Sequence, residues 1–214
     1  MKKITVLLTI LFLSSNVFGF EEGTDYIRLK MPIPNSNKTL IKVFNYECNF
    51  CYKYEKMLTP SLIKQLHGIL NFKPLHIKLR GKYGKEASEL FAVLVFKDIQ
   101  NNISDLTSDK SLFRKAQMAY YSAHRGGKKE TPYSDLESFL HIGFKAVGIS
   151  KEEFEKLKNN HEVQNILKSW NVGYEIVRFK NAPVYIVNGK YLIDTQNVKS
   201  IGELASMIKE LAKK

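Results

Sequence analysis

The chain has 214 residues, 44% of them hydrophobic, and a formal net charge of +12 at pH 7. This length is sufficient for a sizeable core, either in one domain or in one domain with a large insertion. The basic balance is compatible with nucleic acid, anionic lipid or acidic protein partners. Because the lysines are scattered and no RNA- or DNA-binding motif accompanies them, we expect mostly solvated lysines and no nucleic-acid partner.

Residues 1–19 have the pattern of a cleaved secretory signal peptide. Lys2 and Lys3 precede an almost wholly apolar run over 4–13, and Val17-Phe18-Gly19 resembles a cleavage site. A membrane anchor is the alternative, but the apolar run is shorter than the roughly 20 residues that span a bilayer. Cleavage after Gly19 takes 19 of the 214 residues and two lysines, and leaves 195 residues with a net charge of +10. The expected compartment is the periplasm, where disulfides persist.

The next part of the chain predicts a β-α-β unit. Residues 40–46 are rich in β-branched and aromatic side chains, which is typical of a strand, and this strand ends at Glu47. A helix is expected from Cys48 to about Thr59, where Pro60 bends or ends it. Residues 75–79 predict a second short strand.

From about Gly84 the apolar residues recur at helical spacing, and this pattern predicts five helices. The third ends at Gly148, and the fourth begins with a capping box of Ser150 and Glu153. Strand character returns on both sides of Asn188-Gly189, which is a strong hairpin signal, and an amphipathic helix follows over 201–211. The order predicts an α/β domain interrupted by a helical one.

The chain contains two cysteines, Cys48 and Cys51, separated by two residues. A disulfide between them closes a very short loop and therefore stabilises little. A cysteine in the first turn of a helix faces free backbone N–H groups and the positive end of the helix dipole, which lowers its pKa. The second cysteine lies one turn along the same face and can attack a mixed disulfide at the first. We interpret Cys48 as the exposed attacking sulfur and Cys51 as the more buried resolving one.

Two longer stretches carry a more specific signal. The first is the segment from Lys42 to Glu55 around Cys48-Asn49-Phe50-Cys51, preceded by Tyr26-Ile27-Arg28-Leu29 and two prolines. The second is Ala182-Pro183-Val184-Tyr185-Ile186-Val187-Asn188-Gly189-Lys190-Tyr191. Together they resemble the DsbA-like thiol:disulfide oxidoreductases of the thioredoxin superfamily, over essentially the whole chain after residue 19. The resemblance implies an α/β thioredoxin fold with an inserted helical domain, divided as 20–83, 84–176 for the insertion, and 177–214.

The resemblance also implies a substrate site. It makes Pro183 a cis-proline beside the cysteines, and Ala182 a residue that offers its backbone to a bound substrate chain. An ordinary trans proline at the start of an edge strand is the alternative for Pro183. Asn49 and Phe50, between the cysteines, are expected to contact the substrate as well.

The sequence departs from the family near the cysteines. Strong oxidants of the family often have Pro-His where this chain has Asn49-Phe50. Glu47 adds a negative charge next to Cys48 that should raise its pKa, whereas Lys42, at a strand position that the family gives to a buried acid, should lower it. The sequence therefore leaves the reduction potential open.

Three functions from different classes follow. The first is a monomeric oxidase that donates its disulfide to unfolded or folding exported proteins and is reoxidised by a DsbB-type membrane quinone reductase. One variant of it is dedicated to a single acidic substrate. The second is a reductase or isomerase, although isomerases of this group usually add a dimerisation domain and only about 20 residues precede the predicted first strand. The third is a non-catalytic binding module, in which Cys48→Ser would leave function intact.

The sequence favours neither a metal site nor a cofactor. A zinc or copper site needs about four ligands, of which Cys48 and Cys51 supply two, and nothing fixes His67 or His76 near them. We expect His76, and likewise His141 and His161, to be packed or surface residues. Four aromatic residues lie around the cysteines in the sequence, namely Tyr46, Phe50, Tyr52 and Tyr54. They could form an apolar surface on which a peptide docks, or they could fill part of the core.

Overall fold

The computed structural model describes residues 19–124, 132–172, 182–193 and 195–214. The predicted signal peptide lies outside these ranges except for Gly19, and the predicted boundary between residues 176 and 177 lies outside them as well. The domain limits therefore stay a prediction.

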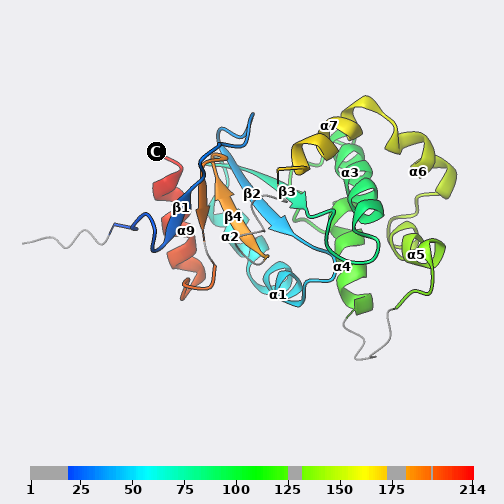
Figure 1. Ribbon diagram of the computed structural model, residues 1–214, viewed down its shortest axis with the longest axis horizontal. Helices are drawn as coiled ribbons and strands as arrows, with labels where there is room; N and C mark the ends of the chain where they lie inside the picture. The colour runs from blue at the N-terminus through cyan, green and yellow to red at the C-terminus, as the bar shows by residue number, and fades with distance from the viewer. Residues whose placement is uncertain (1–18, 125–131, 173–181, 194) are drawn as a thin grey trace, which may run out of the picture.

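The described residues form one mixed sheet with helices on both sides (Figure 1). The five strands, in the spatial order β1-β5-β4-β2-β3, are β1 (Tyr26–Arg28), β5 (Tyr191–Ile193), β4 (Val184–Val187), β2 (Thr39–Phe44) and β3 (Asn71–His76). β2 and β3 are parallel, and the other neighbouring strands are antiparallel. The helices are α1 (Asn49–Met57), α2 (Thr59–Gln65), α3 (Gly84–Gln100), α4 (Leu112–His124), α5 (Leu136–Val147), α6 (Lys151–Lys158), α7 (His161–Trp170) and α9 (Ile201–Leu211).

The central strands are buried on both faces because helices cover each of them. All six residues of β2 and all four of β4 are buried. Leu40 and Val187 pack with α2 and α9, whereas Ile41 and Val43 belong to the core shared with the inserted helices. This continuous burial explains why the strands read as nearly unbroken apolar runs.

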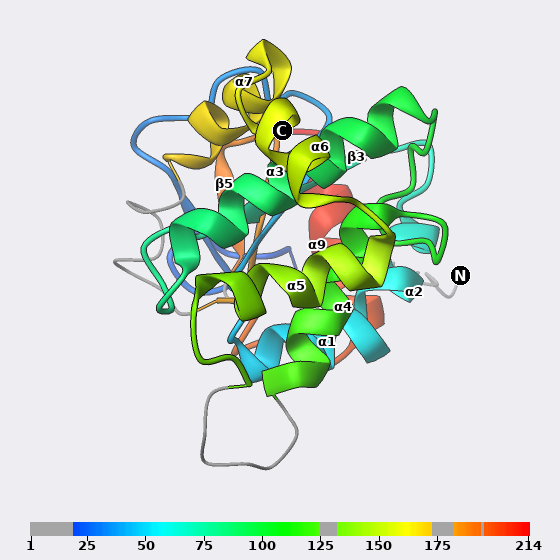
Figure 2. The same ribbon diagram turned by 90° about the vertical axis from the view of Figure 1, so that its right-hand side faces the viewer.

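Helices α3 to α7 form one body at the end of the sheet, and the turned view shows them in front of it (Figure 2). Asp98 of α3 fixes the start of α4. Its buried carboxylate accepts hydrogen bonds from the backbone N–H of Leu112 at 2.8 Å and of Phe113 at 3.1 Å. This contact satisfies N–H groups that a helix start leaves unpaired, and it orients α4 toward α1.

Most predicted elements are confirmed with shifted ends. The helix expected from Cys48 to Thr59 ends at Met57, and a second helix with Pro60 in its first turn follows. The strand expected over 75–79 lies instead over 71–76 and contains Pro74. It is an edge strand, where a missing N–H is tolerated. The strand β1 was not predicted, because three residues are too few for a periodic signal.

The two glycine signals are confirmed. Gly148 ends α5 with a left-handed φ of 70°. Asn188 and Gly189 have φ values of 53° and 65° between β4 and β5, as the hairpin requires. A Cβ on Gly189 would lie 2.7 Å from the carbonyl oxygen of Ile33, so this turn also needs the space that glycine leaves.

His76 predicts a pH dependence of stability. The side chain is 0% exposed, its Nδ1 lies 2.7 Å from Ser88 Oγ, and burial lowers its pKa from 6.5 to about 3. The unfolded chain binds a proton at His76 below about pH 6.5, whereas the folded chain does not until about pH 3, so stability falls as the pH drops through this window. We expect this group alone to remove about 3 kcal/mol between pH 7 and pH 4.

Urea unfolding at several pH values measures this loss. The variant His76→Gln should show a shallower decline between pH 7 and pH 4 than the parent protein, because its side chain does not titrate. Equal slopes for the two proteins would contradict the assignment.

Candidate active site

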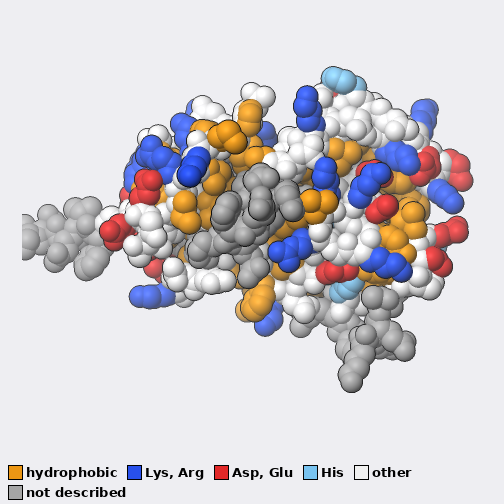
Figure 3. Space-filling model, viewed as in Figure 1, with side chains coloured by type: hydrophobic (Ala, Val, Ile, Leu, Met, Phe, Trp, Pro, Cys, Tyr) orange, Lys and Arg blue, Asp and Glu red, His pale blue; other side chains and the backbone are white. Residues whose placement is uncertain are grey.

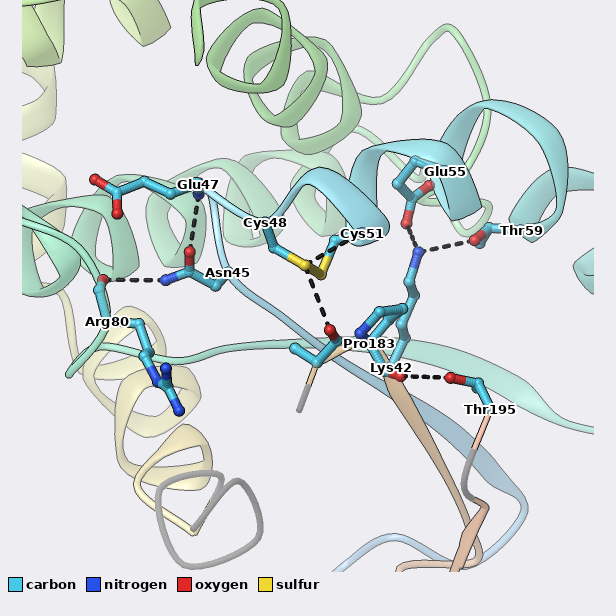
Figure 4. The surroundings of a disulfide bond; sticks show 11 residues. Lys42, Asn45, Glu47, Cys48, Cys51, Glu55, Thr59, Arg80, Pro183 and Thr195 are labelled. Atoms are coloured by element: carbon cyan, nitrogen blue, oxygen red, sulfur yellow. Dashed lines mark hydrogen bonds and ion pairs between the residues drawn. A yellow bond between two sulfur atoms is a disulfide. The ribbon is translucent and has the colours of Figure 1, made fainter. Parts of the chain in front are cut away.

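The turn between β2 and α1 is built by Asn45. Its side-chain oxygen accepts from the N–H of Glu47 at 2.9 Å, and its amide nitrogen donates to the carbonyl of Arg80 at 3.0 Å. Its backbone carbonyl accepts from the N–H of Cys48 at 3.2 Å. Asparagine favours such local turns, and here it delivers Cys48 to the start of α1 (Figure 4).

Cys48 and Cys51 form a disulfide at the start of α1. Cys48 is the N-cap residue, and its Sγ accepts a hydrogen bond from the N–H of Cys51 at 3.0 Å. Cys48 is partly exposed, whereas Cys51 is 0% exposed. The expected difference in exposure is therefore confirmed. A thiolate at Cys48 would face the same N–H and the positive end of α1, both of which lower the pKa of a thiol.

The Ala182–Pro183 peptide bond is cis, and it lies directly against the disulfide. Cys48 Sγ is 3.5 Å from the carbonyl oxygen of Ala182. The carbonyl of Pro183 is already used, since it accepts from Thr195 Oγ1 at 2.9 Å. The backbone carbonyl of Ala182 is thus the part of this segment that lies at the sulfur of Cys48.

An open pocket surrounds the exposed sulfur. Asn49 and Phe50 line it and are exposed, with Phe50 at 66%. Arg80 lines the same pocket with an exposed side chain. The pocket also includes Tyr54, whose hydroxyl donates to the carbonyl of Thr195 at 3.3 Å.

The four aromatic residues around the cysteines do not act as one group. Tyr46 is 0% exposed and belongs to the core, and Tyr52 packs partly buried against it. Phe50 is exposed at the pocket and Tyr54 is partly buried there. An apolar docking surface that includes Tyr46 is therefore wrong, whereas Phe50 is available for contact.

Behind the disulfide lies a buried cluster of charges. Glu55 of α1 is hydrogen-bonded to Lys42 Nζ of β2 on one side, and its other oxygen accepts from Arg114 of α4 at 2.9 Å. Lys42 also donates to Thr59 Oγ1 at 2.8 Å. Lys42 is 1% exposed and Glu55 is 2% exposed. Burial lowers the pKa of Lys42, and the Glu55 carboxylate opposes that shift.

This cluster changes the interpretation of Lys42. The sequence predicts a lysine whose charge acts on the cysteines, but the structure gives this charge a carboxylate partner on α1 itself. Arg114 also pairs with the exposed Asp109 at 3.8 Å. Lys42 and Glu55 therefore form a buried ion pair, and Arg114 is shared between Glu55 and Asp109.

The histidines lie as expected, since His76 is buried and His67, His141 and His161 are exposed. Sequence reasoning missed three residues of the site, namely Asn45, Arg80 and Thr195. An asparagine at the end of a strand signals a turn, so Asn45 was detectable. Arg80 and Thr195 reach the site from distant parts of the chain, and the sequence carries no signal for them.

Comparison with known proteins gives this site its family. No family model matches the chain. The thiol:disulfide interchange protein DsbL of Lelliottia amnigena is 44% identical over 213 residues, which cover 99% of this chain and 96% of the relative. The crystal structure of DsbL from Salmonella enterica serovar Typhimurium has a TM-score of 0.87 at 45% identity, and the match covers 92% of this chain and 98% of that one. The chain belongs to the DsbA and DsbL family.

Members of this family are thiol:disulfide oxidoreductases of the thioredoxin superfamily, and so is this protein. The expected thioredoxin fold with an inserted helical domain is confirmed. A DsbA structure from Klebsiella pneumoniae shares it with a TM-score of 0.70, although only 17% of its residues are identical, and the match covers 91% of this chain and 98% of that one.

The charge cluster predicts a large loss of stability when its anion is removed. Glu55→Gln would leave the buried Lys42 without a counter-charge and Arg114 with the exposed Asp109 alone. Breaking a buried pair in this way costs about 3–5 kcal/mol. The measurement is the free energy of urea unfolding of the oxidised protein.

Glu137→Gln is the matched control, because Glu137 pairs with Lys151 on the surface, where its side chain is 83% exposed. An exposed pair contributes at most about 1 kcal/mol. If both variants lost the same stability, the cluster would not hold α1 in place.

Proposed function

We propose that this protein is a periplasmic disulfide donor whose catalytic residues are Cys48 and Cys51. The proposal rests chiefly on one observation, a partly exposed disulfide cysteine at a helix start whose sulfur lies 3.5 Å from the backbone of a cis-proline segment. This arrangement offers a reactive sulfur and a backbone edge for a substrate chain at the same place.

The reaction is a two-step exchange. A substrate thiolate attacks Cys48 Sγ, the bond between Cys48 and Cys51 breaks, and its electron pair leaves on the Cys51 thiolate. A second substrate thiolate then attacks the substrate sulfur of the mixed disulfide and releases the Cys48 thiolate. Two electrons and two protons pass from the substrate dithiol to the pair. Cys48 leaves more readily when its pKa is low, and its position at the start of α1 lowers that pKa.

The substrate chain lies along Ala182 in this proposal. The segment before a cis-proline presents its backbone in an extended form, to which a peptide adds as a strand. Asn49 and the exposed ring of Phe50 then contact residues beside the substrate cysteine. Because backbone pairing and one apolar contact depend little on the amino-acid sequence of the substrate, this site suits many substrates.

The proposed setting is the periplasm, reached through a signal peptide cleaved after Gly19. There a DsbB-type membrane protein accepts the two electrons from the reduced pair and passes them to quinone. Across the described residues, no helix combines the length and hydrophobicity of a membrane span. The protein is proposed to act as a monomer on unfolded or folding exported proteins.

The basic charge offers weak support for a dedicated acidic substrate. On the face in Figure 3, the described Lys and Arg side chains are spread over both halves of the molecule, with acidic and apolar side chains between them. Arg80 is a basic residue at the pocket itself. The general donor therefore remains the proposal.

Trapping tests the exchange mechanism. In a Cys51→Ala variant the mixed disulfide at Cys48 cannot be resolved from within, so we expect Cys48 to accumulate in adducts with exported proteins. Non-reducing gels of periplasmic extracts detect them, and Cys48→Ser/Cys51→Ala should form none. A Cys51→Ala protein with a reactive Cys48 and no adducts would contradict the mechanism.

The reduction potential tests the direction of electron flow. Equilibration with glutathione buffers should give a value near about −120 mV, as for a strong oxidant, because the helix start favours the reduced thiolate. A value near about −270 mV, typical of a cytosolic reductant, would contradict the proposed disulfide donor and indicate a reductase instead.

A further inference from the structure

The side chain of Glu47 is held away from the cysteines. Glu47 directly precedes Cys48, and a carboxylate at this position would raise the pKa of the Cys48 thiol if it faced the sulfur. In the structure its carboxylate extends away from the disulfide (Figure 4). The hydroxyl of Tyr133 donates to Glu47 Oε1 at 3.0 Å.

Tyr133 is itself fixed within the inserted helical domain. It is 3% exposed, and its ring lies against three others, those of Tyr83 at 5.4 Å, Phe139 at 5.0 Å and His124 at 5.6 Å between centroids. A ring packed on several sides cannot turn without displacing its neighbours. The position of its hydroxyl, and therefore of the Glu47 carboxylate, is set by this packing.

The hydrogen bonds around Tyr133 have one direction. Since Tyr133 gives its proton to Glu47, the 3.4 Å contact between the hydroxyls of Tyr46 and Tyr133 requires Tyr46 to donate. Tyr46 in turn accepts from the backbone N–H of Tyr83 at 3.1 Å. Such a chain polarises each successive donor and strengthens the last bond, the one to the carboxylate.

The groups around this chain keep it intact near neutral pH. Burial raises the pKa of Tyr46 to about 12 and raises that of Tyr133 as well, so both keep their protons. Burial lowers the pKa of His124, and nearby Glu47 opposes that shift. With His124 neutral, the partners of the Glu47 carboxylate among the described residues of this cluster are hydroxyls, that of Tyr133 at 3.0 Å and that of Tyr46.

We propose that Tyr133 is a positioning residue for the redox pair, which holds the Glu47 carboxylate away from Cys48 and so protects the Cys48 thiolate from a negative neighbour. The inference rests on the proposed function, because it concerns the thiolate that leaves in the exchange. It gives the inserted helical domain a part in setting the reactivity of Cys48.

A double-mutant cycle tests this role. In reduced Tyr133→Phe the carboxylate loses the Tyr133 hydroxyl that holds it and reaches the vicinity of Cys48, so we expect the pKa of Cys48 to rise. The rate of alkylation by iodoacetamide, located at Cys48 by mass spectrometry and measured against pH, should fall about threefold below that pKa, equivalent to about 0.5 pKa unit. The reduction potential should become more negative by about 15 mV, since tenfold is about 30 mV.

The second half of the cycle removes the carboxylate. In a Glu47→Gln background, Tyr133→Phe should leave the Cys48 pKa unchanged, because no negative charge remains to be positioned. The matched control is Tyr120→Phe, which deletes another buried hydroxyl of the same aromatic cluster, one that donates to the carbonyl of Phe139 at 3.1 Å. It should lower stability without moving the Cys48 pKa.

Three outcomes would overturn the proposal. They are an unchanged or lower Cys48 pKa in Tyr133→Phe, an equal rise in the Glu47→Gln background, or an equal rise in Tyr120→Phe. These measurements of the Cys48 pKa do not depend on the direction in which the protein transfers electrons. A failure of the disulfide-donor function in the trapping experiment is therefore distinguishable from a failure of this inference.

Discussion

The pairing of Glu55 is the constraint on which the geometry of the site depends. A carboxylate without water or a counter-charge is very costly inside a protein, so Glu55 stays buried only while Lys42 and Arg114 remain in contact with it. These partners belong to β2 and α4, and Glu55 lies one turn beyond Cys51 on α1. The sheet and the inserted helices together therefore fix α1, and with it the position of Cys48 against Ala182.

The same cluster takes part in the electrostatics of the pair. Lys42 and Glu55 are buried, so the fields of their charges are weakly screened, and Arg114 lies between Glu55 and the exposed Asp109. The two cations favour a thiolate at Cys48, as the N-terminus of α1 does, and the Glu55 carboxylate between them opposes it. The chain has Phe50 where strong oxidants of the family often have histidine. Among the described residues, the start of α1 is the source of thiolate stabilisation that the geometry shows directly.

How far the sequence predicts this structure depends on the range of each interaction. The helix start at Cys48, the hairpin at Asn188-Gly189 and the end of α5 at Gly148 were predicted correctly, because each is decided by neighbouring residues. The strand β3 was displaced because its pairing with β2, and not its own composition, places Pro74 within it. Short β1 exists only through its pairing with β5.

The candidate site divides in the same way. The two cysteines follow from their spacing at a predicted helix start, whereas the cis-proline segment follows from the resemblance to the DsbA-like family. The partners of Glu55 follow from neither, because Lys42 is 13 residues and Arg114 is 59 residues away from it in the chain. No local pattern indicates that a buried glutamate will be shared between these two cations. Long-range polar contacts are set by packing, which the sequence specifies only as a whole.

The inserted helical domain thereby contacts both ends of α1. Arg114 reaches Glu55 near its C-terminal end, and Tyr133 reaches Glu47 just before its N-terminal end. Both contacts are bonds to carboxylates, which are stronger than bonds between neutral groups. A small shift of the insertion would therefore alter the charge near Cys48 as well as the position of its helix. The insertion is thus part of the environment that determines how readily the Cys48 thiolate leaves.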